Sequence, residues 1–151
     1  MTVRTGESLQ ASIATFFARY ESFFNRSLSG DMDRGEIAAL YASEFIAASP
    51  VGVMTGKNDE RLEVAMAQGY DRYRAIGTKS MRVRDIRISP MDDLHCVAHV
   101  AWRATYAREN RPDVAVDFDV HYLVRTLGGE PKVFGWVAGD EQALLREHGI
   151  V

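Results

Sequence analysis

The chain has 151 residues, of which 46% are hydrophobic and 26% charged, and its formal net charge is −3. These values are typical of a folded globular domain and exclude a disordered chain, so we expect a single domain over residues 1–151. The acidic balance argues against nucleic acid as a partner, because nucleic-acid binding needs a concentrated basic surface.

Apolar runs in the sequence are short. A membrane span needs about 20 consecutive apolar residues, and no run approaches that length. The first ten residues are polar and lack the apolar core of a signal peptide. We therefore expect a cytoplasmic protein without a membrane partner. The single cysteine, Cys96, excludes an internal disulfide, and we expect it to be a small core residue.

The first half of the chain and its last residues show helical signals. Apolar residues recur at three- and four-residue spacing over residues 8–28, which predicts a long amphipathic helix that ends before Gly30. A second, short helix is expected after the N-cap Asp33. A third helix, capped by Asn58 or Asp59, should run to about residue 76, and a last helix should follow Asp140.

From Ser80 onward apolar and polar residues alternate, which predicts strands. Four strands fit, at residues 81–89, 95–108, 114–127 and 132–138. Turn-like sequences separate them, so the strands should pair antiparallel in order. Upstream, residues 44–49 indicate one more short strand and residues 51–57 a loop. Helices followed by a meander predict an α+β fold, with the N-terminal helices on the concave face of a curved, mostly antiparallel sheet.

The alternation also assigns each strand side chain to one face of the sheet. The face under the helices receives Cys96, Ala98, Val100, Trp102, Ala104, Tyr106, Val116, Phe118, Val120, Tyr122, Val124, Phe134, Trp136 and Ala138. The outer face receives Asp85, His99, Arg103, Asp117, Asp119, His121 and Arg125 together with Val83, Val97, Ala101, Leu123 and Val137. Counting back from the turns places Asp85 opposite His99 and Arg103 opposite Asp119. The apolar residues on this outer face predict a homodimer.

The order of the predicted elements resembles the nuclear transport factor 2-like superfamily, which includes polyketide-cyclase-like (SnoaL-like) proteins and has a cone-shaped fold. Ala48-Ser49-Pro50-Val51-Gly52 is similar to the loop of ketosteroid isomerases in which an Asp precedes Pro-Val-Gly. Asp119-Val120-His121-Tyr122 lies near the second Asp of those enzymes. Ser49, however, stands at the position of the base, and Phe23 rather than Tyr20 matches the oxyanion tyrosine. Because a serine without a neighbouring base accepts protons poorly, steroid isomerisation is not the leading interpretation.

The resemblance implies a pocket between the first helix, the third helix and the concave sheet face. Residues expected to contact a ligand there are Tyr20, Tyr41, Ser49, Tyr70, Tyr73, Trp102, Tyr122 and Trp136. Aromatic walls with a few hydroxyl groups suit a small, flat, apolar ligand. Ordinary core packing accounts equally well for the same aromatic residues.

A catalytic base would have to come from Asp119 or His99, if a bulge turned one of them inward. Otherwise both belong to a charge ladder or a polar dimer contact on the outer face. His95 and His99 have no third ligand nearby in sequence, and no phosphate-binding loop is present, so we expect neither a metal nor a cofactor. Two functions stay open: binding of a small apolar ligand without chemistry, and a lyase, isomerase or cyclase activity on a polyketide-like or steroid-like carbonyl substrate.

Overall fold

The computed structural model of the chain describes residues 6–30 and 32–151. Its elements are, in chain order, α1 (Gly6–Leu28), α2 (Arg34–Leu40), β1 (Tyr41–Ser49), β2 (Gly52–Lys57), α3 (Glu60–Ala75), β3 (Thr78–Pro90), β4 (His95–Arg108), β5 (Arg111–Leu127), β6 (Glu130–Ala138) and α4 (Glu141–Glu147). No helix within the described ranges is both long enough and apolar enough to cross a membrane.

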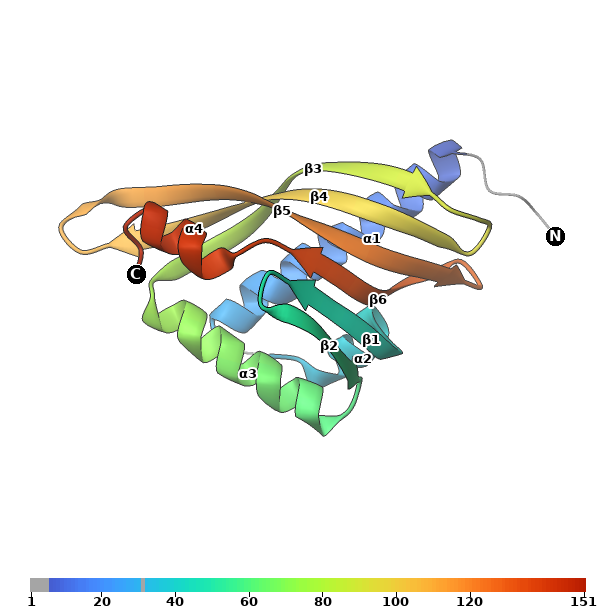
Figure 1. The fold of residues 1–151 in the computed structure, drawn as a ribbon, viewed down its shortest axis with the longest axis horizontal. Helices are drawn as coiled ribbons and strands as arrows, with labels where there is room; N and C mark the ends of the chain where they lie inside the picture. The colour runs from blue at the N-terminus through green and yellow to red at the C-terminus, as the bar shows by residue number, and fades with distance from the viewer. Residues whose placement is uncertain (1–5, 31) are drawn as a thin grey trace.

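The six strands form one sheet in the order β2-β1-β6-β5-β4-β3. All neighbours pair antiparallel except β1 and β6, which are parallel because the connection between them crosses over. The long strands curve, and α1 runs along one face of the sheet (Figure 1). Helix α3 lies beside α1. The α+β fold with helices on the concave face of a mostly antiparallel sheet is thereby confirmed.

Helix boundaries follow the capping residues in the sequence. Asp33, Asp59 and Asp140 are the N-caps of α2, α3 and α4, and the side chain of each accepts hydrogen bonds from backbone N–H groups of the first turn. The long helix ends at Leu28, and Gly30 follows with φ 98°, a conformation that glycine adopts without steric cost. The predicted caps and the end of the first helix are confirmed.

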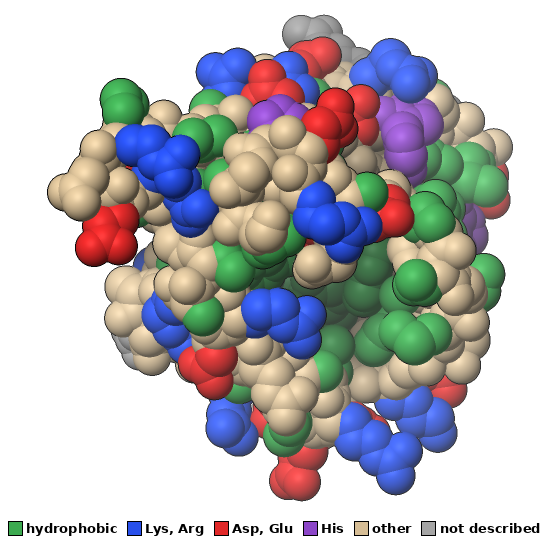
Figure 2. Space-filling view, turned by 60° about the vertical axis from the view of Figure 1, so that its left-hand side comes forward, with side chains coloured by type: hydrophobic (Ala, Val, Ile, Leu, Met, Phe, Trp, Pro, Cys, Tyr) green, Lys and Arg blue, Asp and Glu red, His purple; other side chains and the backbone are tan. Residues whose placement is uncertain are grey.

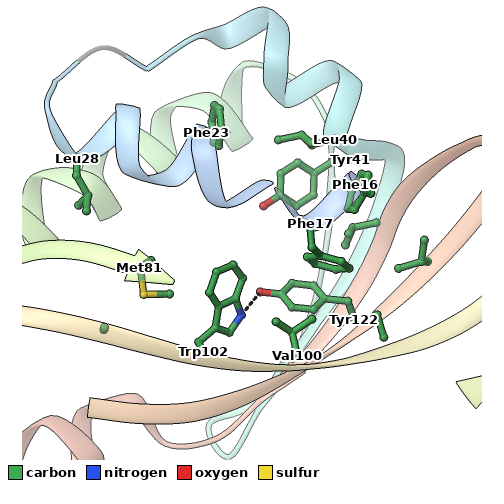
Figure 3. Packing of buried hydrophobic residues seen from close by; sticks show 14 of the residues in the cluster. Phe16, Phe17, Phe23, Leu28, Leu40, Tyr41, Met81, Val100, Trp102 and Tyr122 are labelled. Carbon is green, nitrogen blue, oxygen red and sulfur yellow. Dashed lines mark hydrogen bonds between the residues drawn. The ribbon is translucent and has the colours of Figure 1, made fainter. Parts of the chain in front are cut away.

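The core lies between α1 and the concave sheet face. The β4 residues assigned to the helix side are at most 3% exposed, namely Cys96, Ala98, Val100, Trp102, Ala104 and Tyr106. Trp102 and Tyr122 point from the sheet toward the helices, and the ring of Tyr122 lies 5.0 Å from that of Phe17 in α1 (Figure 3). The predicted direction of the meander is therefore confirmed.

The short strand pair at the other end of the sheet differs from the prediction. Residues 52–57, expected as a loop, form β2, which pairs antiparallel with β1 through a turn at Pro50 and Val51. The preceding strand is also longer than expected and begins at Tyr41. Pairing within the hairpin gives the backbone N–H and C=O groups of both segments their hydrogen-bond partners. The strand therefore forms although it contains Gly52 and Gly56.

The pairing of β3 with β4 differs from the prediction in two ways. A bulge between Val83 and Asp85 places Val83 opposite Trp102 on the helix side, because an extra residue in one strand shifts the side chains beyond it. The β3–β4 turn places Pro90 opposite Cys96, so Arg87, not Asp85, lies opposite His99.

The β4–β5 turn is also tighter than predicted. It consists of Glu109 and Asn110, the latter with φ 58°, so Arg103 lies opposite Asp117 rather than Asp119. A further irregularity between β5 and β6 buries Val133 and leaves Phe134 beside His95 instead of under the helices.

Two polar side chains of α1 hold the edge strand β3. The amide Nδ2 of Asn25 donates to the carbonyl of Met81 (2.8 Å), and its Oδ1 accepts from the Met81 N–H (2.9 Å). The carboxylate of Glu21 accepts from the N–H of Val83 (2.7 Å). These contacts satisfy edge groups that no neighbouring strand reaches, and they set the position of α1 over the sheet.

Candidate functional site

A cavity of about 570 Å³ lies among α1, α3, α4 and the concave face of the sheet. All seven aromatic side chains expected at a pocket line it, namely Tyr20, Tyr41, Tyr70, Tyr73, Trp102, Tyr122 and Trp136. In the space-filling view hydrophobic side chains lie at the bottom of a hollow whose rim carries charged groups (Figure 2). The cavity is therefore a mainly aromatic chamber open to solvent at a polar rim.

Three tyrosine hydroxyl groups form a cluster in the most buried wall. The hydroxyls of Tyr20 and Tyr41 lie 2.6 Å apart, and the ring of Tyr122 lies 5.5 Å from that of Tyr20. The indole Nε1 of Trp102 donates to the Tyr122 hydroxyl over 3.1 Å (Figure 3). Because the Tyr122 oxygen is the acceptor in that bond, its own O–H proton is left to donate to a ligand atom.

Burial determines the protonation of this cluster. It raises the pKa of Tyr41 and Tyr122 well above 10.0, and it raises the pKa of Tyr20 as well. All three groups are therefore protonated at neutral pH. The cluster acts as a hydrogen-bond donor toward the cavity, which suits a carbonyl, phenolic or enolate oxygen of a ligand.

The rim of the cavity is acidic. The first part of β5 runs past the end of β6, whose last pair is Val120 with Ala138, and so brings Asp117 and Asp119 to the rim. Asp117 accepts two hydrogen bonds from Arg103, at 2.7 and 3.0 Å, and this guanidinium lowers the pKa of that carboxyl. Asp119 lies 3.9 Å from the guanidinium of Arg84.

Glu141, the first residue of α4, adds a carboxylate to the cavity wall, although the residue as a whole is solvent-exposed. Partial burial of the carboxyl group raises its pKa, while Tyr73 and the charge of Arg72 act in the other direction. Glu141 lines the cavity, and the sequence reasoning missed it. The predicted N-cap Asp140 fixed where the helix starts, but nothing in that helix indicated that it turns back over the cavity.

Comparison with known proteins assigns the chain to a family. The sequence profile of a family described as NTF2-like protein (DUF6841) matches residues 9–141. The chain belongs to this NTF2-like family. The resemblance to nuclear transport factor 2-like proteins is thereby confirmed. No curated protein matches the sequence.

Solved structures share the fold of this NTF2-like protein at low sequence identity. Aln2 from a Streptomyces species is 15% identical with a TM-score of 0.70 over 97% of this chain and 99% of that chain. Kfla4162 from Kribbella flavida is 12% identical with a TM-score of 0.65 over 94% and 99%. A protein with a cystatin-like fold from Caulobacter vibrioides is 11% identical with a TM-score of 0.63 over 94% and 96%. These similarities establish the fold alone.

The candidate bases lie in different places in this NTF2-like protein. Asp119 reaches the rim of the cavity, whereas His99 lies on the outer face of the sheet. There the Nδ1 atoms of His99 and His121 are 2.7 Å apart, and Nε2 of His99 is 2.9 Å from the Ser89 hydroxyl. Asp119 therefore borders the cavity, but it pairs with the outer-face residue Ala101 and its side chain is 65% exposed.

Ser49 lies at the end of β1, opposite Gly52 in the hairpin. Its hydroxyl accepts from the N–H of Val51 over 3.4 Å, and Ser49 is not among the residues that line the cavity. The residue at the isomerase base position is thus separated from the tyrosine cluster. Within residues 6–30 and 32–151, no group of three or more His, Cys, Asp or Glu side chains is arranged to hold a metal ion.

A second hollow, of about 850 Å³, lies between the β1–β2 hairpin and the start of α3. Trp136 lines both hollows and stacks on Phe45 with ring centroids 5.2 Å apart. The walls of this hollow include Lys57 and Arg61 but none of the clustered tyrosines. The aromatic cavity is therefore the better candidate for a ligand site.

Proposed function

We propose that this NTF2-like protein binds a small, flat, apolar or aromatic molecule in the aromatic cavity. The observation that carries the proposal is the spare hydroxyl proton of the Tyr20, Tyr41 and Tyr122 cluster in a chamber otherwise walled by rings. The cavity volume of about 570 Å³ falls within the range of about 300–1,000 Å³ that is usual for small-molecule sites. The ligand's rings would pack on Trp102 and Trp136, and one ligand oxygen would accept the free proton.

A matched ligand pair tests this proposal. Binding of 2-acetylnaphthalene, which has a ketone oxygen, is compared with binding of 2-ethylnaphthalene by thermal shift and by titration calorimetry. The ketone should bind about tenfold more tightly, because it satisfies a buried donor that the hydrocarbon leaves unpaired. Absence of binding by both compounds, and by larger two- and three-ring ketones and phenols, would contradict the proposal.

Variants assign the ligand contact to the cluster. The triple variant Tyr20→Phe/Tyr41→Phe/Tyr122→Phe removes all three hydroxyl groups and should abolish the preference for the ketone. Tyr70→Phe is the matched control, because Tyr70 lines the same cavity and is not one of these three residues. An unchanged ketone preference in the triple variant would show that the ligand oxygen binds elsewhere.

A lyase, isomerase or cyclase activity on a polyketide-like or steroid-like carbonyl substrate is the second candidate function. Glu141 favours it, because a carboxylate with a raised pKa in the wall of a cavity has the properties of a proton acceptor. It would remove a proton next to a carbonyl whose oxygen the tyrosine cluster stabilises. Protein-dependent deuterium exchange at the α-carbon of a bound ketone, lost in Glu141→Gln, would support this activity. Binding without exchange would support the binding function alone.

We also infer that the chain forms a homodimer through the outer face of the sheet. The row His121, Val137, Ala48 and Val53 crosses four strands on this face, and the exposed fractions of Val137 and Val53 are 48% and 71%. Apolar side chains that continue across several strands favour contact with another protein surface. Val137→Asp should convert the dimer to a monomer in analytical ultracentrifugation, and a wild-type monomer at micromolar concentration would refute the inference.

A further inference from the structure

The aromatic cavity and the second hollow lie end to end along one helix. Helix α3 contacts both edge strands of the sheet, β2 and β3, and so crosses the concave face (Figure 1). Leu62 and Ala65 line the second hollow, and the cavity begins at the next residue, Met66, and continues to Tyr73. Residues at three- and four-residue spacing share one face of a helix, and Leu62 and Tyr73 are about 16 Å apart along its axis. The same face of α3 therefore lines both spaces.

The sheet side of the two spaces is also continuous. Trp136 of β6 pairs with Tyr122 of β5 on one side and with Ala47 of β1 on the other. Ala47 pairs in turn with Met54 of β2. Directly paired residues point to the same face of a sheet. Tyr122 lines the cavity, whereas Ala47 and Met54 line the second hollow. The two spaces therefore lie on the same face of the sheet, one on each side of Trp136.

Trp136 is the one residue, within the described part of the chain, that lines both spaces. Its indole is held between two rings: Tyr41 lies edge-on with centroids 5.9 Å apart, and Phe45 stacks on it at 5.2 Å. A Cβ atom added at Gly56 would lie 2.5 Å from Cζ of Phe45, so this ring has no room to retreat toward β2. The indole is therefore a fixed wall between the cavity and the second hollow.

We propose that Trp136, backed by Phe45, determines the length of ligand that this NTF2-like protein accepts. The indole closes the cavity toward the second hollow, so a ligand can extend along α3 only as far as Trp136. The inference rests on the proposed binding of a small aromatic ligand and assigns the residue that limits its length. The ligand class is then a compact ring system, and a linear one that must extend past the indole is selected against.

Two ketones of different length test this wall by titration calorimetry: 2-acetylnaphthalene, and 2-acetylanthracene, which has one more ring in line. Trp136→Ala joins the cavity to the second hollow. It should raise the affinity for the longer ketone relative to the shorter one about tenfold over wild type, because the third ring is then buried. Trp136→Leu, which keeps an apolar side chain, gives the same comparison if Trp136→Ala folds poorly. Failure of both ketones to bind the wild-type protein and the variants would count against the proposed function itself.

Further variants determine where the third ring lies. Ala65 is exposed and lines the second hollow but not the cavity, so Ala65→Phe in the Trp136→Ala background should cancel the gain for the longer ketone alone. In the wild-type background Ala65→Phe should change neither affinity. Phe24→Ala is the matched control, because Phe24 lines only the cavity and its loss enlarges that space without opening the wall. Binding with no gain in Trp136→Ala, a gain that survives Ala65→Phe, or an equal gain in Phe24→Ala would overturn the role of Trp136 and leave the proposed function standing.

Discussion

Trp102 and Tyr122 are hydrogen-bonded although they are not direct partners in the sheet. Trp102 of β4 pairs with Phe118, and Tyr122 of β5 pairs with Ala98, so the 3.1 Å bond from the indole to the phenol runs diagonally between the two strands. Both side chains are almost fully buried under α1. This bond holds the Tyr122 hydroxyl in the wall of the cavity, beside the hydrogen-bonded hydroxyls of Tyr20 and Tyr41.

Tyr122→Phe removes the only acceptor described for the buried indole N–H. We expect the free energy of unfolding to fall by about 1–3 kcal/mol, because an unpaired buried donor loses its water without replacement. Urea denaturation measures this change. In a Trp102→Phe background, Tyr122→Phe should lower the free energy of unfolding distinctly less, since the indole N–H that would be left unpaired is then absent. Equal costs in the two backgrounds would contradict the role given to this hydrogen bond.

Asn25→Ala removes the side chain that bonds both backbone groups of Met81 at the edge of the sheet. Two partly buried backbone groups lose their partners, and we expect a loss of about 1–3 kcal/mol in the free energy of unfolding. Hydrogen exchange at the Met81 amide should also accelerate relative to wild type. Ser22→Ala, an exposed position on the same helix, serves as the control and should change stability by less than about 0.5 kcal/mol.

Gly56→Ala tests the close approach between the β1–β2 hairpin strands. A Cβ atom at this position would lie 2.5 Å from Cζ of the Phe45 ring, which also stacks on Trp136. Displacing that ring should lower the free energy of unfolding by about 1–3 kcal/mol, measured by thermal or chemical denaturation. Gly69→Ala in α3 is the opposite case, because no atom lies within 4 Å of its added Cβ. It should stabilise the helix by about 0.5–1 kcal/mol; equal effects of the two substitutions would refute this account.

His99 should titrate below 6.5 in the folded protein. Burial, the charge of Arg87 and the neighbouring His121 all lower its pKa. Between the pKa of the folded state and that of the unfolded state, 6.5, the folded protein therefore binds fewer protons than the unfolded chain. The contribution of His99 to the free energy of unfolding is complete above pH 6.5 and is lost as the pH falls toward the pKa of the folded state. An NMR titration of the imidazole protons measures the value, and Arg87→Gln should raise it. A His99 pKa above 6.5 in the wild-type protein would contradict this environment.

Local patterns in the sequence determined much of the architecture. Three aspartates were identified as helix N-caps, and strict alternation placed Trp102 and Tyr122 under the helices, because capping and a period of two depend only on neighbouring residues. The order of helices and strands was sufficient to indicate the NTF2-like fold, and the aromatic side chains expected at a pocket all line the cavity.

Only the tertiary structure decided which polar groups share the cavity. The exact positions of the β3–β4 turn and of the two-residue turn at Asn110 decided the partners of His99 and Arg103, because a displaced or shorter turn shifts an entire register without a clear local signal. Tyr20 and Glu141 are far apart in sequence and line one cavity only because α4 returns over the open edge of β5. Contacts of this kind depend on the path of the whole chain, whereas caps and alternation depend on a few adjacent residues.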